Sequence, residues 1–115
     1  MKIQKFTQGQ LLDMPLALQP NVVMEEKGVS ERRSKALTME GRGHARFGVW
    51  EASVGTFNRE VELGEIMHIL IGSAVFTDDS GHAIEMNPGD TLVFDPNTRG
   101  TWVVKEPIRK LYVLV

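Results

Sequence analysis

The sequence predicts an all-β domain, on three observations. From Lys35 onward, short runs rich in β-branched and aromatic residues alternate with turn residues at close and even spacing. The turns are chemically explicit at 78–81 (Asp-Asp-Ser-Gly), 87–90 (Asn-Pro-Gly-Asp) and 95–97 (Asp-Pro-Asn), whose side chains cap the backbone or tolerate positive φ. No ten-residue stretch carries a helical period of apolar residues.

The expected strands follow from these boundaries, at 35–40, 44–53, 57–63, 66–71, 73–77, 82–86, 91–94, 101–104 and 108–115. The segments 66–71 and 111–115 are apolar with little alternation, so both of their faces need cover. The N-terminal segment and a second copy of the chain are the candidates for the second layer. We expect a homodimer.

Residues 1–34 differ from the rest of the chain. Pro15 and Pro20 interrupt the stretch, and residues 20–35 are rich in Glu, Arg, Lys and Ser with little periodicity. We expect an N-terminal arm over 1–34, loosely structured and with one or two short strands, ahead of a barrel over 35–115. A partly disordered tail is the alternative.

Composition narrows the class of protein. An apolar content of 42% is enough to build the core of one domain of 115 residues. The absence of cysteine excludes thiol nucleophiles, thiolate metal sites and disulfides. A net charge of −2 argues against a nucleic-acid partner, and no apolar run reaches the length of a membrane span. The first eight residues lack the apolar core of a secretory signal, so we expect a cytoplasmic protein without a membrane partner.

Two spaced motifs point to a family. Glu65 followed by six residues and Gly72, and then Pro88-Gly89-Asp90, resemble the two motifs of the cupin superfamily. The segments 48–53 (Gly-Val-Trp-Glu-Ala-Ser), 55–57 (Gly-Thr-Phe), 100–102 (Gly-Thr-Trp) and 109–112 (Arg-Lys-Leu-Tyr) are similar to the cupin_3 branch. That branch includes domains likened to ureidoglycine aminohydrolase and to ethanolamine-utilisation protein Q. The resemblance implies an RmlC-like jelly roll, the double-stranded β-helix of cupins, and does not by itself assign a function.

The resemblance also implies where a metal would sit. Metal-binding cupins present two histidines and a glutamate in the first motif and a third histidine in the second, a donor set suited to Mn, Fe, Ni or Zn. Glu65 holds the glutamate position, while the three histidine positions fall on Asn58, Glu60 and Gly100. We therefore expect no metal and no other cofactor.

The three histidines of the chain, His44, His68 and His82, do not form a cluster at any metal-ligand spacing. His68 lies three residues after Glu65 and is expected on the opposite face of its strand.

The candidate pocket comprises Asn58, Glu60, Glu65, Met67 and Trp102. Period-two alternation and the family register together predict that the first three share the inner face, above an apolar floor that includes Met67. Glu60 and Glu65 are the catalytic candidates, as an acid–base pair, and with Asn58 they could instead hold a hard cation through oxygen. The alternative is that Glu60 is a rim residue bonded to a neighbour.

The two tryptophans have two readings. Either can stack on a ligand in the barrel mouth or simply fill the core. Trp102 lies two residues after Gly100, on the face of the lost histidine position, where its ring could take the space of a metal. The sequence leaves the direction of Lys110 and Tyr112 open.

Three functions are compatible with these residues. We favour a small-molecule-binding cupin with a degenerate metal site, for a polar or nitrogen-containing metabolite. The alternative is a metal-independent or cation-assisted aminohydrolase-like enzyme that uses Glu60 and Glu65. The second alternative is a non-catalytic structural dimer whose pocket is filled. An enzyme needs both carboxylates unpaired and accessible, a binding protein needs an open mouth, and a structural protein needs that mouth closed by Trp102.

Overall fold

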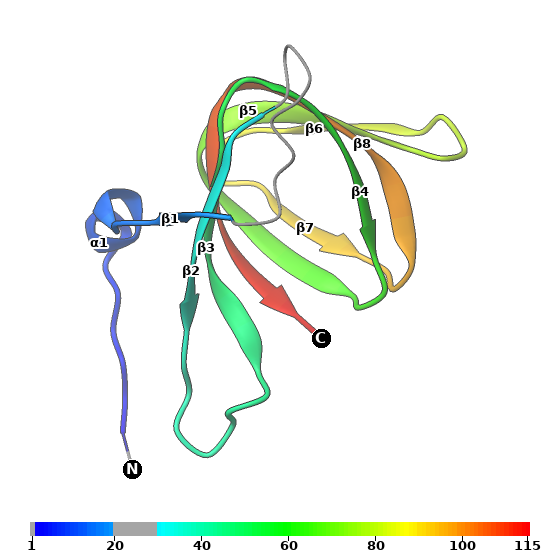
Figure 1. Ribbon diagram of the computed structural model, residues 1–115. Helices are drawn as coiled ribbons and strands as arrows, with labels where there is room; N and C mark the ends of the chain where they lie inside the picture. Colours follow the sequence, from blue (N-terminus) through cyan, green and yellow to red (C-terminus); the bar gives the residue numbers. More distant parts are fainter. Residues whose placement is uncertain (1, 20–29) are drawn as a thin grey trace.

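The predicted all-β fold is confirmed in the computed structural model, which describes residues 2–19 and 30–115 (Figure 1). In these described residues, one short helix precedes eight strands, which form a single antiparallel jelly roll. The elements are α1 (Gln8–Asp13), β1 (Ala17–Leu18), β2 (Arg32–Leu37), β3 (Arg46–Ala52), β4 (Gly55–Val61), β5 (Glu65–Asp78), β6 (Ala83–Met86), β7 (Thr91–Phe94) and β8 (Thr98–Leu114). No helix in this part of the chain is long and apolar enough to cross a membrane.

The sheet is organised around the longest strand. The order of the strands in the sheet is β1-β2-β3-β8-β5-β6. Outside this order, β4 pairs with β8 and β7 pairs with β5. β8 therefore has three antiparallel partners, β3, β4 and β5. The expected strands 66–71 and 73–77 are the two halves of β5, which is continuous. The expected strands 101–104 and 108–115 likewise lie along one continuous strand, β8.

β5 bends at Gly72, where its pairing with β8 shifts register. Ahead of the bend the odd-numbered residues Glu65, Met67 and Ile69 are buried, and beyond it the even-numbered Ala74 and Phe76 are. A bulge that changes the alternation lets both halves of one strand face the same interior. The bend requires glycine, because φ at Gly72 is +88° and a Cβ there would collide with the carbonyl oxygen of Pro107.

The expected turns are present. The carboxylate of Asp78 accepts hydrogen bonds from the backbone of Ser80 and His82, both at 2.9 Å, and from the Ser80 hydroxyl at 2.7 Å. These bonds, led by that of the Ser80 side chain, lower the pKa of Asp78. Asp90 closes the next turn by accepting from the backbone of Asn87, and Gly89 has the expected positive φ of +90°.

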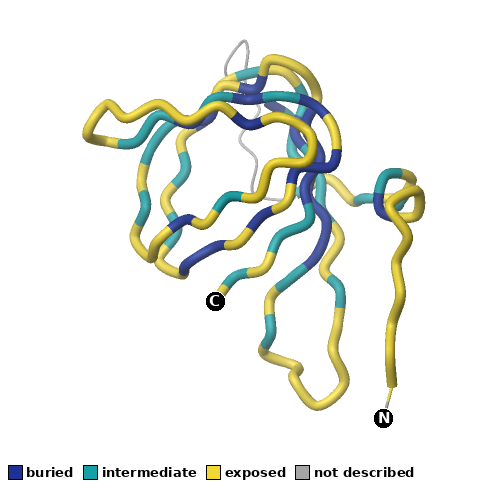
Figure 2. Tube along the Cα trace, turned by 180° about the vertical axis from the view of Figure 1, so that it is seen from behind, coloured by how far each residue is buried: buried dark blue, intermediate teal, exposed yellow. Residues whose placement is uncertain are grey.

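The core lies inside the barrel, where Figure 2 shows buried residues gathered along the strands. It is strongly aromatic. Trp102 stacks on Phe57 with 5.9 Å between ring centroids, and it also contacts Trp50 and Phe76. The buried members of this core are Trp50, Ala52, Phe57, Met67, Ile69, Ala74, Phe76, Met86, Phe94, Trp102, Val104 and Ile108.

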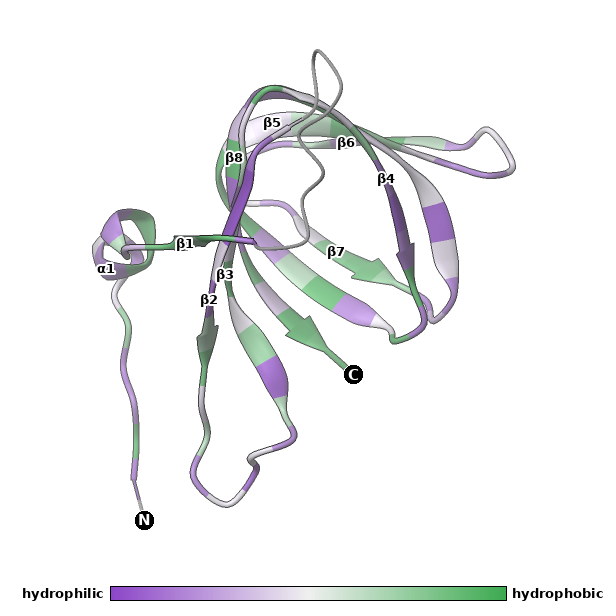
Figure 3. Ribbon diagram, viewed as in Figure 1, coloured by the Kyte–Doolittle hydropathy of each residue, from purple (hydrophilic) through white to green (hydrophobic). Residues whose placement is uncertain are grey.

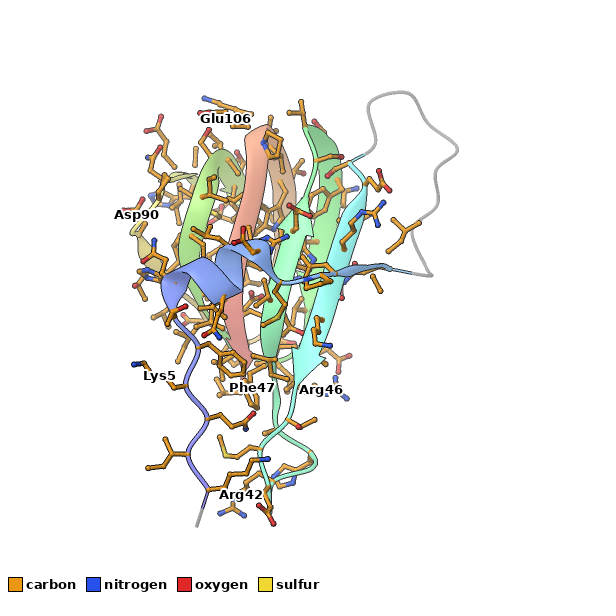
Figure 4. The ribbon with its side chains drawn as sticks, turned by 90° about the vertical axis from the view of Figure 1, so that its left-hand side faces the viewer. Lys5, Arg42, Arg46, Phe47, Asp90 and Glu106 are labelled. Atoms are coloured by element: carbon orange, nitrogen blue, oxygen red, sulfur yellow. The ribbon has the colours of Figure 1, made fainter. Side chains whose placement is uncertain are left out.

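The N-terminal segment is more ordered than we expected, because it contains helix α1. Thr7 and Gln10 form a capping box at its start, a local signal that a search for longer helical periods misses. In Figure 4, where the side of the molecule that carries α1 faces the viewer, the helix lies across the outside of the sheet. Leu11 packs there with Val49 and Leu70, and the Arg109 guanidinium donates to the carbonyl oxygens that end the helix.

The helix covers only part of the outer face. Ile66 pairs with Val93 on one side and Val113 on the other, and the three side chains remain 41%, 70% and 36% exposed. Figure 3 shows the same apolar character along β7 and the end of β8. The expected homodimer remains a prediction, and this row of three residues is the surface we assign to it.

Candidate functional site

A cavity of about 310 Å³ opens on the inner side of the sheet. This volume lies near the lower end of the range for small-molecule pockets, roughly 300–1,000 Å³. Strands β3, β4, β5 and β8 supply most of the wall, and β2 and the residue after β1 complete it. The lining residues are Gln19, Arg32, Trp50, Phe57, Asn58, Arg59, Glu60, Glu65, Lys110, Tyr112 and Leu114.

Three charged side chains from three strands meet at the base of the cavity. Glu65 is 2% exposed, and each of its carboxylate oxygens is engaged by a different cation. Arg59 donates from Nη2 to Oε1, and Lys110 donates from Nζ to Oε2 at 2.7 Å. We call these residues the Arg59–Glu65–Lys110 cluster. Charge-assisted hydrogen bonds of this kind are about twice as strong as neutral ones, and each carboxylate oxygen accepts one of them.

Lys110 is surrounded by aromatic rings as well as by charge. Its Nζ lies 4.4 Å from the ring centroid of Trp50 and 4.9 Å from that of Trp102, so two indole faces help to hold the ammonium group. The side chain is 2% exposed. Burial, and then the neighbouring Arg59 guanidinium, lower the pKa of Lys110 well below its ordinary value.

Two further cations face the same space from different sides. Burial lowers the pKa of Arg59 to about 10, so this side chain remains charged at neutral pH. The Arg32 guanidinium lies 4.5 Å above the ring of Phe57, and burial lowers its pKa too. Its buried Nε has no hydrogen-bond partner within residues 2–19 and 30–115. The cavity is therefore rich in positive charge.

The structure corrects the predicted phase of β4. Phe57 and Arg59 face the interior, opposite Trp102 and Gly100 of β8, whereas Asn58 and Glu60 alternate to the outside. Asn58 accepts a hydrogen bond from Thr101, and Glu60 forms an exposed ion pair with Arg99. Both residues border the cavity, but neither side chain joins Glu65. A shift of one residue along a strand moves every side chain to the other face. Here the shift places Arg59 inside the barrel, where Glu60 was expected.

The remaining predicted residues take different places. Glu65 lies inside, as expected, and His68 is exposed on the opposite face with its Nδ1 2.9 Å from the Thr91 hydroxyl. Met67 and Trp102 are fully buried beneath the cavity rather than in its wall. Of the two tryptophans, Trp50 borders the cavity.

The donor set does not suit a transition metal. Asn58 and Glu60 point outward, and a side chain at Gly100 would collide with the carbonyl oxygen of Thr77. Both oxygens of Glu65 are already occupied by cations. Within the part of the chain that the structure describes, no three His, Asp or Glu residues are grouped as ligands. The ammonium group of Lys110 lies beside Glu65, the one family ligand position that is kept, and its positive charge opposes a metal cation there.

Sequence reasoning missed the three cations of the site. Lys110 and Tyr112 both point toward the cavity, and Arg32 comes from a strand that begins ahead of the predicted barrel boundary at Lys35. A signal for Arg59 was available, because apolar Phe57 and Val61 mark the buried phase of β4 and Arg59 lies between them.

Comparison with known proteins agrees with this fold. The EutQ protein of Clostridium difficile superposes with a TM-score of 0.66 over 74% of this chain and 68% of its own, at 19% identity. The putative ethanolamine utilization protein Q of Salmonella typhimurium gives 0.65 over 73% and 68%, also at 19% identity. A DUF861 family protein of Thermotoga maritima is 33% identical over 58% of this chain and 76% of its own, with a TM-score of 0.57.

No match was found among curated proteins. The family model for the EutQ-like cupin domain, Cupin_3, matches residues 39–112, which is more than half of the chain. The two motifs, the jelly roll and this match agree, and the chain belongs to the Cupin_3 family of EutQ-like cupin domains.

Proposed function

We propose that this protein is a small-molecule-binding cupin that works without a transition metal and takes a polar metabolite. The observation that carries the proposal is the cavity above the Arg59–Glu65–Lys110 cluster, which is open and combines polar groups with the faces of Trp50 and Phe57. Pockets that bind small molecules combine apolar surface with fixed polar groups, and the larger polar share of this lining favours a polar ligand.

The two alternatives receive less support. An acid–base mechanism through Glu60 and Glu65 needs two accessible carboxylates close together. Glu65 is instead buried between two cations, and Glu60 is paired with Arg99 on the outside. A purely structural protein would have its mouth closed by Trp102, but that ring lies in the core and about 310 Å³ remain open above it.

A thermal-shift screen of polar and nitrogen-containing metabolites tests the proposal. A ligand that binds only the native state raises the melting temperature by mass action. Leu114→Trp fills the cavity from its wall and is expected to abolish the shift, whereas Ile84→Trp, on exposed β6 outside the cavity, is expected to retain it. If no compound raises the melting temperature, or if Leu114→Trp responds like the wild type, the cavity is not a binding site.

A further inference from the structure

The charges around the cavity do not balance. Arg32, Arg59 and Lys110 line it, and Glu65 is the carboxylate that lies among them. Glu60 borders the cavity but is engaged by Arg99 at 3.1 Å. Arg59 and Lys110 therefore share one carboxylate, and across residues 2–19 and 30–115 Arg32 has no partner of opposite sign.

An excess of positive charge in a partly buried space is unfavourable. Buried charges are normally paired, because removing an ion from water is unfavourable unless an opposite charge replaces the lost hydration. Glu65 carries a single negative charge, which Arg59 and Lys110 already share. An anion that enters the cavity would restore the balance, and a cation or a second amine would worsen it.

The guanidinium groups have unused donors to offer. A guanidinium carries five N–H donors in a planar fork that matches a carboxylate. Arg59 uses Nη2 toward Glu65, and the buried Nε of Arg32 has no partner within the described residues. Both side chains border the cavity, Arg59 beside Phe57 on β4 and Arg32 above the ring of Phe57.

Apolar side chains of the wall adjoin the guanidinium groups. Trp50 and Phe57 are 7% and 8% exposed and present their rings to the cavity, with Leu114 beside them. Polar and apolar regions thus lie within one space of about 310 Å³, which limits the ligand to a small molecule. An anionic head on a planar apolar body matches both regions.

We infer that the ligand of this cavity is a small organic acid, whose carboxylate lies between Arg32 and Arg59 and whose body packs against Trp50 and Phe57. This inference rests on the proposed binding function and adds the chemical class of the ligand.

Isothermal titration calorimetry with three probes of equal size tests the inference. Benzoate, benzamide and benzylamine share one ring and differ in charge. Benzoate is expected to bind roughly tenfold to a hundredfold more tightly than benzamide, which lacks the charge, and benzylamine is expected not to bind. Raising the salt concentration should weaken benzoate binding, because part of its affinity is electrostatic.

Two variants separate the site from general electrostatics. Arg32→Gln is expected to weaken benzoate binding by about tenfold or more while leaving benzamide binding unchanged, and it leaves the residues of the Arg59–Glu65–Lys110 cluster in place. Arg42→Gln removes an equal charge from the exposed loop between β2 and β3, outside the cavity, and should leave benzoate binding unaltered.

The outcomes distinguish the inference from the function on which it rests. Absence of benzoate binding, preference for benzamide or benzylamine, or equal effects of Arg32→Gln and Arg42→Gln would each overturn the assignment of an organic acid. If neutral polar compounds still raise the melting temperature in the wild type but not in Leu114→Trp, the binding function survives with a different ligand class. If they do not, both conclusions fail together.

Discussion

Replacing Glu65 by Gln is the sharpest perturbation of this fold. The substitution keeps the shape of the side chain but removes the anion between two buried cations, Arg59 and Lys110. The amide oxygen can still accept from one of the two donors, but the amide NH2 group faces the other. One charge-assisted hydrogen bond is therefore lost, at roughly 1.5–3 kcal/mol, and the unpaired buried cation adds a desolvation cost of similar size, for a sum of roughly 3–6 kcal/mol. Breaking a buried pair by removing one partner costs a similar amount, roughly 3–5 kcal/mol.

Lys110→Met provides the matched comparison. It removes one cation from the same cluster but leaves Glu65 paired with Arg59, so the charge of the remaining pair is balanced. The methionine thioether suits the space between the indoles of Trp50 and Trp102. We expect the free energy of unfolding to change by less than about 1 kcal/mol, since replacing a buried ion by an apolar group of similar size is often neutral.

Urea unfolding followed by far-ultraviolet circular dichroism measures both variants. This signal reports mainly the sheet, whereas tryptophan fluorescence would respond directly to the substituted groups, which lie close to both indoles. For a chain of this size the expected loss in Glu65→Gln corresponds to a fall in melting temperature of roughly 12–20 °C. Equal losses in the two variants would refute the reasoning, because charge balance would then not determine the stability of the cluster.

Four further predictions follow from the same structure. Because the pKa of Lys110 is lowered, the unfolded chain holds more protons than the folded chain at any pH between that pKa and 10.5. The free energy of unfolding of the wild type, measured relative to that of Lys110→Met, should therefore rise with pH in that window. A difference that stays flat or falls with pH in urea titrations would contradict this. Gly89→Ala, at a positive φ in open space, should lower the free energy of unfolding by roughly 1–2 kcal/mol. Gly72→Ala, where the new Cβ also collides with a carbonyl group, should lower it by roughly 2–5 kcal/mol. Equal losses in the two variants would show that the bend of β5 at Gly72 relaxes. Elemental analysis after dialysis should find no stoichiometric transition metal, and one equivalent that is lost on Glu65→Ala would reverse that expectation. Sedimentation equilibrium should give a dimer of the 12.9 kDa chain. Ile66→Lys should dissociate this dimer, and Ile84→Lys, at an exposed position of β6, should not. A monomeric wild type would exclude the dimer.

The sequence was a good guide to the barrel because its turns have strong local chemistry. Asp78 and Asp90 each cap their own turn, and Gly89 supplies the positive φ that was expected there. Helix α1 was missed, because six residues are too few for a period to stand out and because its anchor, Arg109, lies 98 residues away from Leu11. Contacts over such a separation leave no trace in a local pattern.

The site was harder to predict because its phase was taken from the spacing of a motif. Counting back from Glu65 placed Asn58 and Glu60 inside, whereas the apolar residues of the strand itself, Phe57 and Val61, indicate the opposite phase. The inward direction of Lys110 could not have been derived from the sequence, because the strand that carries it is apolar on both faces and gives no alternation to follow.

The central place of β8 has a consequence for synthesis in the cell. β3, β4 and β5 all leave the ribosome before the strand that joins them, so none of them has its main partner during elongation. Their unpaired edges and apolar faces are exposed to other chains until residues 98–114 have emerged. A message truncated ahead of Thr98 would thus produce an aggregation-prone chain and a substrate for chaperones and proteases, not a smaller barrel.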